Sequence, residues 1–99
     1  MYLIRDIMHC KPGQVRPMAE KFKALNKVMK KMGFKPARIL TDVSGERFWT
    51  VIVETETKDL GEYAKMSRTT MSDKALQKAM KGYHDLVDHG RREIYMIEG

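Results

Sequence analysis

A run of six residues, Phe48–Val53, carries the strongest hydrophobic pattern in the chain. Side chains alternate across a β-strand, so as a strand the run divides into two sets: Phe48, Thr50 and Ile52 on one side, and Trp49, Val51 and Val53 on the other. Both sets are largely apolar, and a strand with two apolar faces needs cover on both. The run therefore predicts a strand in a sheet that has helices on one face and a second layer on the other.

Four strands are predicted from their composition and from the residues that break the chain between them. They are Tyr2–Cys10, Pro36–Val43, Arg47–Thr55 and Arg91–Ile97. Between the second and third strands, Ser44-Gly45-Glu46 predicts a tight hairpin, because glycine adopts the positive φ that such turns require.

The connection after the first strand predicts a long, basic helix. After a break at Lys11-Pro12-Gly13, apolar residues at intervals of three and four predict a helix over Gln14–Met32, with Gly33 as its stop. Its lysines could bind an anion or a nucleic acid, although nucleic-acid surfaces usually add arginines and exposed aromatic residues. The other interpretation is a solvated polar face. These lysines are Lys21, Lys23, Lys27, Lys30, Lys31 and Lys35.

The connection before the last strand predicts two shorter helical segments. The first begins at Asp59, a typical N-cap residue, and is interrupted by residues 69–72, where β-branched and capping residues cluster. The second is capped by Ser72 or Asp73 and extends to Gly90. Its apolar stripe has helical spacing and consists of Leu76, Ala79, Met80, Tyr83, Leu86 and Val87.

The predicted order of elements is β-α-β-β-α-β in a single domain over residues 1–99. This order is typical of the ferredoxin-like α+β fold, an antiparallel four-stranded sheet with helices on one face. The uncovered face then needs a partner, and the simplest partner is a second copy of the chain, which predicts a homodimer. The sequence leaves open which side of Phe48–Val53 meets the partner.

Composition narrows the class of protein. No apolar run approaches the roughly 20 residues of a transmembrane helix, and no signal-peptide core follows Met1, so a cytoplasmic protein without a membrane partner is expected. The single cysteine, Cys10, fits a reducing compartment. The net charge of +6 favours anionic partners in general and does not define a nucleic-acid binder.

The breaks and caps of the chain also form a recurring combination. They are Lys11-Pro12-Gly13, Ser44-Gly45, Asp59-Leu60-Gly61-Glu62-Tyr63, Ser72-Asp73 and Arg92-Glu93-Ile94-Tyr95. Together they resemble the dimeric α/β-barrel superfamily, in the style of its NIPSNAP-like and antibiotic-biosynthesis-monooxygenase-like branches. The resemblance implies two sheets packed face to face in a dimer, with a pocket between each sheet and its own helices.

The same resemblance bears on cofactors. The haem-degrading branch carries a Trp and a His on the second helix, and the corresponding positions here fall near Thr69 and Ala79. Haem chemistry is therefore not expected, and no cofactor is predicted. The other enzymes of the superfamily are cofactor-independent monooxygenases and isomerases, and fold similarity alone assigns no reaction.

Asp6 is the first candidate for chemistry. It lies in the middle of the first strand between Ile4 and Met8, and a carboxylate on a largely apolar face can act as a general acid or base. The other interpretation is an ion pair with Arg38 or Arg92 from a neighbouring strand. The sequence leaves both interpretations open.

Two tyrosines and a histidine complete the candidate site. Tyr63 and Tyr83 lie on the inner stripes of the second helical region, where their hydroxyls could face a pocket or could satisfy a partner at the core edge. The predicted catalytic residues are Asp6, Tyr63 and His84. The predicted ligand-binding residues are Arg38, Trp49, Met66 and Tyr83.

The segment from His84 to His89 offers two histidine–aspartate pairs spaced four residues apart. Metal sites use this spacing, but on a helix the two pairs would point in different directions and each would supply only two ligands. A solvated helix end is the favoured interpretation, so no metal is predicted.

The leading hypothesis is a homodimer that binds a small, mostly apolar organic molecule between its sheet and its helices. If it is catalytic, the resemblance implies a cofactor-independent monooxygenase or isomerase, with Asp6 as the base. The first alternative is a non-catalytic ligand-binding or interaction module. The second is an anion or nucleic-acid binder that uses the first helix.

Overall fold

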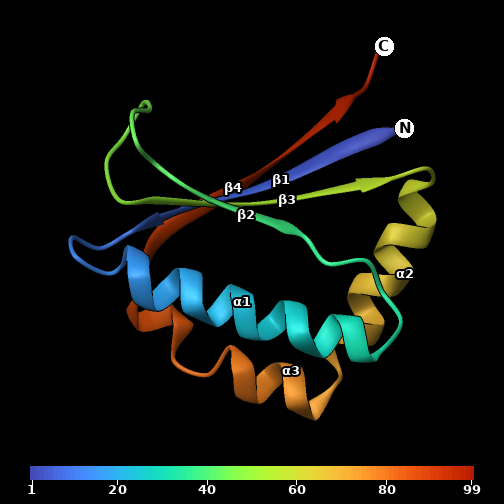
Figure 1. The fold of residues 1–99 in the computed structure, drawn as a ribbon, viewed down its shortest axis with the longest axis horizontal. Helices are drawn as coiled ribbons and strands as arrows, with labels where there is room; N and C mark the ends of the chain where they lie inside the picture. The colour runs from blue at the N-terminus through green and yellow to red at the C-terminus, as the bar shows by residue number, and fades with distance from the viewer.

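The computed structural model describes residues 1–99, the whole chain, and contains four strands, three α-helices and one 3₁₀ turn. In chain order they are β1 (Tyr2–Cys10), α1 (Val15–Lys31), β2 (Arg38–Thr41), β3 (Thr50–Thr57), α2 (Leu60–Met71), α3 (Lys74–Ala79), the turn η1 (Tyr83–Asp85) and β4 (Val87–Met96). Figure 1 shows α1 and α3 side by side below the sheet, with α2 at one end of it. None of the helices combines the length and the apolar character that crossing a membrane requires.

The four strands form one antiparallel sheet in the order β2-β3-β1-β4. The two central strands, β1 and β3, are adjacent, and Ile7 of β1 lies opposite Ile52 of β3 and Arg91 of β4. With the helices on one face, this arrangement is the ferredoxin-like α+β fold that the order of the predicted elements indicated.

The core lies between α1 and the helix-facing side of the sheet. Met18 and Phe22 of α1 pack against Cys10 at the end of β1 and Val51 in β3, and Met18 and Val51 are fully buried. Val53, two residues further along β3, packs against the same cluster. The side of β3 that carries Val51 and Val53 therefore faces the protomer's own helices, which leaves Ile52 on the open face.

Aspartates cap both α2 and α3, Asp59 as predicted and Asp73 as one of the two predicted candidates for its helix. The carboxylate of Asp59 accepts a hydrogen bond from the backbone N–H of Glu62 at 3.0 Å. The carboxylate of Asp73 accepts one from the N–H of Leu76 at 3.1 Å. Each bond satisfies a donor that the first turn of a helix would otherwise leave unpaired.

The tight hairpin predicted at Ser44-Gly45-Glu46 is wrong. Residues 42–49 form a longer loop, and β3 begins at Thr50 instead of Arg47. The loop is closed at its neck by Asp42, whose carboxylate accepts a hydrogen bond from the N–H of Thr50 at 2.8 Å, and the Thr50 hydroxyl donates to the Arg47 carbonyl at 3.1 Å. These local hydrogen bonds compete with pairing between β2 and β3. The strand β3 therefore begins at Thr50, two residues after the first residue of the apolar run.

The predicted extent of the last helix is also wrong, because only its first part is helical. It ends at Ala79 and not at Gly90, and Gly82, in a left-handed conformation with φ of 83°, redirects the chain before the next turn. The chain then makes the η1 turn and enters β4 at Val87, which lies opposite Cys10 of β1. The histidine–aspartate spacings of residues 84–89 therefore do not lie on a helix.

Candidate functional site

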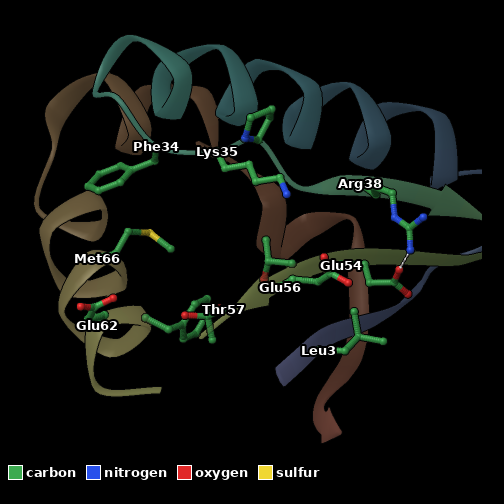
Figure 2. A pocket seen from close by; sticks show the side chains of 12 residues that line it. Leu3, Phe34, Lys35, Arg38, Glu54, Glu56, Thr57, Glu62 and Met66 are labelled. Atoms are coloured by element: carbon green, nitrogen blue, oxygen red, sulfur yellow. Dashed lines mark hydrogen bonds and ion pairs between the residues drawn. The ribbon is translucent and has the colours of Figure 1, made fainter. Parts of the chain in front are cut away.

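A pocket of about 430 Å³ lies between β3, α2 and the segment that joins α1 to β2 (Figure 2). The shortness of β2 produces it. β2 pairs with β3 only from Val51 to Glu54, so Thr55–Thr57 at the end of β3 has no strand beside it on that edge. The segment Phe34–Pro36 and the first turns of α2 surround the space that a longer β2 would fill.

The walls of this pocket differ in polarity. Figure 2 shows Phe34 and Met66 together at one end and Arg38 with Glu54 at the other. Lys35, Glu56 and Glu62 add further charges to the lining. Such a pocket matches a molecule that has an apolar part and a polar or charged group.

The charged end of the pocket is built on a buried carboxylate. Glu54 is only 8% exposed, and its two oxygens form ion pairs with Arg38 and, at 3.3 Å, with Nε of Arg5. A buried carboxylate needs such partners, because its desolvation is costly when it is unpaired. Arg38 is thus held in place by a residue that the sequence did not single out.

Tyr63 lies in the pocket wall beside an ion pair on the helix-facing side of the sheet. Nε and Nη2 of Arg92 donate to the two carboxylate oxygens of Asp6 at 2.6 and 3.2 Å. The same guanidinium carbon lies 5.6 Å from the centre of the Tyr63 ring. Burial raises the pKa of Tyr63, and the nearby Asp6 carboxylate raises it further. Tyr63 is therefore a neutral hydroxyl that can donate a hydrogen bond.

Asp6 pairs with one of the two arginines that the sequence offered as its partners. Arg92 lies directly opposite Asp6 on β4, whereas Arg38 is occupied by Glu54. The hydrogen bond to Asp6 and its charge raise the pKa of Arg92. Two hydrogen bonds to one guanidinium fix the position of the Asp6 carboxylate.

The predicted site residues fall into separate places. Arg38, Tyr63 and Met66 line the pocket of Figure 2, and Asp6 lies beside its wall. Trp49 lines a second pocket at the other end of the sheet. Tyr83 packs against the core cluster, and its ring stacks at 3.9 Å between centroids on His84, which is exposed on η1.

Nine of the twelve lining residues were not predicted as site residues, and Phe34 and Glu54 are the two that the proposed binding uses most. Phe34 directly follows Gly33, the predicted stop of the first helix, and an aromatic residue after a helix stop is a usable signal. Glu54 carries no such signal in the sequence. Its burial requires Arg5 and Arg38 as partners, and both lie opposite Glu54 only because of the register of β1, β2 and β3.

No protein-family model matches the sequence, and no curated protein matches it. Solved structures do match the fold. An uncharacterized NIPSNAP domain protein from Burkholderia xenovorans aligns with a TM-score of 0.79 and 14% identity over 99% of this chain and 95% of that chain. A NIPSNAP family protein from Agrobacterium tumefaciens aligns with a TM-score of 0.80 and 11% identity over 96% of this chain and 90% of that chain.

A protein proposed to be an antibiotic biosynthesis monooxygenase, from Nitrosomonas europaea, aligns with a TM-score of 0.69 and 13% identity over 97% of each chain. The chain therefore has the ferredoxin-like fold found in NIPSNAP and antibiotic biosynthesis monooxygenase structures, as its motifs indicated. At these identities the likeness establishes the fold and assigns no reaction.

Proposed function

We propose that this protein binds a small organic molecule in the pocket between β3 and α2, and that it does so as a homodimer. The observation that carries the proposal is the convergence of Phe34, Met66 and Tyr63 on one pocket that also reaches the Arg38–Glu54 ion pair. The apolar side chains contact the body of the ligand, and the Tyr63 hydroxyl and the ion pair bind a polar group. The ligand of this proposal is amphipathic, because five of the twelve lining residues are charged: Lys35, Arg38, Glu54, Glu56 and Glu62.

Placing a charge in the apolar end of the pocket should weaken binding. In the Met66→Lys variant, a fluorescent amphipathic probe, 8-anilinonaphthalene-1-sulfonate, should bind about tenfold more weakly, since an apolar contact worth on the order of 1–2 kcal/mol is lost. Fluorescence titration measures the dissociation constant. Met71→Lys is the matched control, because Met71 lies on the same helix and is 67% exposed.

The control should bind the probe as the unchanged protein does. Equal affinity of the Met66→Lys variant and the unchanged protein would place the bound probe elsewhere and would contradict the assignment of this pocket.

The second candidate function is cofactor-independent oxygenation. It is favoured by the Tyr63 hydroxyl in the pocket wall beside the Asp6–Arg92 pair, and by the monooxygenase name of one fold neighbour. Without a cofactor the substrate itself must reduce oxygen, so the substrate class is an electron-rich phenol or hydroquinone. Tyr63 would hold the substrate oxygen, and Asp6 with Arg92 would orient Tyr63.

An oxygen-uptake assay separates the enzyme from the binding module. With 1,4-dihydroxynaphthalene as substrate, uptake should exceed spontaneous oxidation, and Tyr63→Phe should lower the catalysed rate by about 100-fold, the lower end of the effect of a positioned proton donor. Asp6→Asn should also lower the catalysed rate, by no more than Tyr63→Phe does, while leaving the assembly intact. Tyr83→Phe is the matched control, because Tyr83 packs against the core cluster outside this pocket. Uptake no faster than spontaneous oxidation would reject the enzyme and leave the binding module.

The homodimer is supported by the composition of the open face of the sheet. All helices lie on the other side or at the end of the sheet (Figure 1). Strand register places Leu40, Ile52 and Ile7 in one apolar row across β2, β3 and β1. We propose that this row packs against the same row of a second copy.

A further inference from the structure

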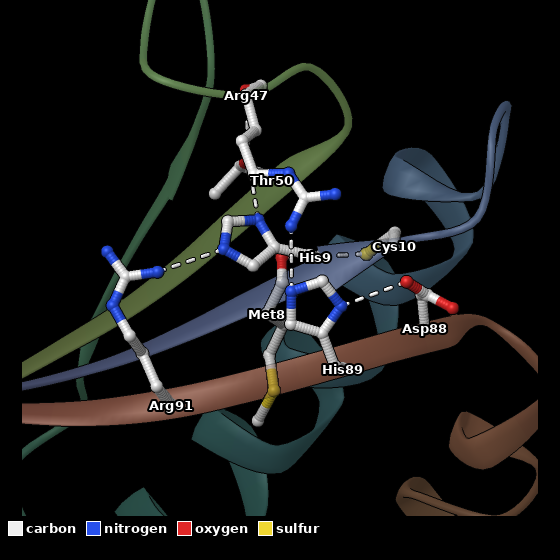
Figure 3. Close-up of polar contacts among 8 residues, drawn as sticks. All are labelled: Met8, His9, Cys10, Arg47, Thr50, Asp88, His89 and Arg91. Atoms are coloured by element: carbon white, nitrogen blue, oxygen red, sulfur yellow. Dashed lines mark hydrogen bonds and ion pairs between the residues drawn. The ribbon is translucent and has the colours of Figure 1, made fainter.

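A cluster of two histidines and two arginines lies at the end of the sheet opposite the pocket of Figure 2. His9 of β1 and His89 of β4 are directly opposite each other in the strand register, and their ring centroids are 4.7 Å apart. Arg47 from the loop of residues 42–49 and Arg91 from β4 each contact one of the imidazoles (Figure 3). His9 is only 6% exposed.

The hydrogen bonds fix the roles of the ring nitrogens, because a guanidinium only donates. Nη1 of Arg91 lies 3.0 Å from Nε2 of His9, and Nη1 of Arg47 lies 2.8 Å from Nε2 of His89, so both Nε2 atoms accept. The remaining nitrogen of His89 donates to Asp88 at 2.9 Å. Burial, together with the nearby cations, lowers the pKa of His9. The two arginines carry a permanent positive charge in this cluster.

Arg47 has an imidazole as its partner, whereas each arginine in the strands has a carboxylate. Arg5 and Arg38 pair with Glu54, Arg91 pairs with Glu93, and Arg92 pairs with Asp6. Arg47 has no carboxylate within ion-pair distance, and the hydrogen-bond partner of its guanidinium is the imidazole of His89. A guanidinium binds an oxyanion more strongly than an imidazole nitrogen, so Arg47 is free to exchange His89 for an incoming anion.

A second pocket, of about 540 Å³, opens beside this arginine. Lys11 lines it and supplies a second cation, and Trp49 and Phe48 supply aromatic surface. Trp49 is 43% exposed and Phe48 is 83% exposed, which is unusual for large apolar side chains. Asp88 is the one acidic residue in the lining, and its carboxylate is engaged by His89.

The backbone of Trp49, whose indole lines this pocket, has a strained conformation. Trp49 has φ of 60°, and it is the only residue other than glycine with a positive φ. Its carbonyl accepts a hydrogen bond from the N–H of Cys10 at 2.8 Å, which ties the conformation to the end of β1. Backbone strain at a large side chain persists where the surrounding structure enforces it, and such residues cluster at binding sites.

We infer that this second pocket binds a small aromatic oxyanion, with the anionic group on Arg47 and Lys11 and the ring on Trp49. The two cations, Arg47 and Lys11, and the exposed indole of Trp49 line one pocket and come from a single protomer. Arginine and lysine recognise both carboxylate and phosphate, so the ligand class is an aryl carboxylate or an aryl phosphate. This inference is independent of the proposed function, because the two pockets share no lining residue.

Trp49 is the only tryptophan of the chain and therefore reports directly on the site. Benzoate and phenyl phosphate should each be titrated into the ¹⁵N-labelled protein while the indole N–H resonance is followed. A saturable shift is expected for at least one of them, and the tighter of the two identifies the oxyanion. Benzamide, which has the ring without the charge, should bind at least tenfold more weakly. Inorganic phosphate, which has the charge without the ring, should also bind at least tenfold more weakly than phenyl phosphate.

The Arg47→Gln variant should weaken binding at least tenfold while the amide resonances of the sheet stay in place, because Arg47 lies on an exposed loop. Arg68→Gln is the matched control, since Arg68 is an exposed arginine on α2 without a carboxylate partner. Met66→Lys should leave this affinity unchanged, which separates the site from the pocket of the proposed function.

The absence of a saturable shift with either probe would overturn the inference. Unchanged affinity in Arg47→Gln, or equal affinity for benzamide and benzoate, would equally overturn it, because the guanidinium would then not bind the anionic group. Equal affinity for phosphate and phenyl phosphate would overturn the role of Trp49 as the ring contact.

Discussion

Replacing Met18 with alanine is expected to lower the free energy of unfolding by about 2–5 kcal/mol, the range measured for truncating a buried methionine or leucine. Met18 is fully buried and packs in the cluster that joins α1 to β1 and β3. Urea denaturation of the variant and of the unchanged protein measures the difference. Met71→Ala is the matched control, because Met71 is 67% exposed and should change the stability by less than about 0.5 kcal/mol.

The expected loss is large because the core is small. The central cluster has four buried members, Cys10, Met18, Phe22 and Val51, in a chain of 99 residues. Domains of this size are stable by only about 5–15 kcal/mol, so Met18→Ala removes a substantial part of the total. Met18→Leu keeps the volume and should cost less than about 1.5 kcal/mol. A loss of less than 1 kcal/mol in Met18→Ala would show that neighbouring side chains fill the space and that Met18 is not central to the core.

The signals that predicted the fold correctly are local ones. β1 has the bounds that its sequence indicated, and α1 differs from its predicted range by one residue at each end. The spacing of Met18, Phe22 and Met29 follows the helix period, and all three are buried. Asp59 and Asp73 cap their helices through bonds to backbone groups three residues away. Each of these features depends on residues close in the chain.

The predictions that failed depend on contacts between distant segments. Tyr83, Leu86 and Val87 have helical spacing and do pack against the core, but from a 3₁₀ turn and the start of a strand. Their position is set by the pairing of Val87 with Cys10, more than 70 residues earlier in the chain. Hydrophobic spacing predicts which residues are buried, but more than one backbone conformation can bury the same residues.

The ion pairs of the site depend on strand register, which the sequence does not determine. Asp6 meets Arg92, and Glu54 meets Arg5 and Arg38, because antiparallel pairing places them side by side. The sequence named both arginines as partners for Asp6 and had no means of choosing, since a shift of the register would change every pair. The grouping of Tyr63 with Met66 was accessible, because both lie on α2 and are three residues apart.

The open face of the sheet is organised in rows that a second copy could cover. One row across the four strands consists of Arg38, Glu54, Arg5 and Glu93, with charges of alternating sign. The glutamates of this row each pair with a neighbouring arginine, Glu54 with Arg38 and Arg5, and Glu93 with Arg91. Such a face is internally neutralised, so its burial does not leave isolated charges.

The apolar row next to these charges should therefore mediate the association. Leu40→Asp is expected to weaken the dimer by on the order of 100-fold or more. In a two-fold interface the substitution occurs twice, and each buried leucine contributes about 1.5–3 kcal/mol. Sedimentation equilibrium at micromolar concentration should find a dimer for the unchanged protein and a monomer for the variant. Leu60→Asp is the matched control, because Leu60 begins α2 and its exposure of 37% is close to the 38% of Leu40.

A stable monomer of the unchanged protein at micromolar concentration would contradict the homodimer itself. A dimer that persists in Leu40→Asp but dissociates in Leu60→Asp would move the interface from the sheet to α2. The choice matters for the proposed pocket, because Leu3 and Glu54 in its lining belong to the open face of the sheet, whereas Tyr63 and Met66 belong to α2. A dimer through the sheet would close the pocket from the side of Leu3 and Glu54, and a ligand would then enter past α2.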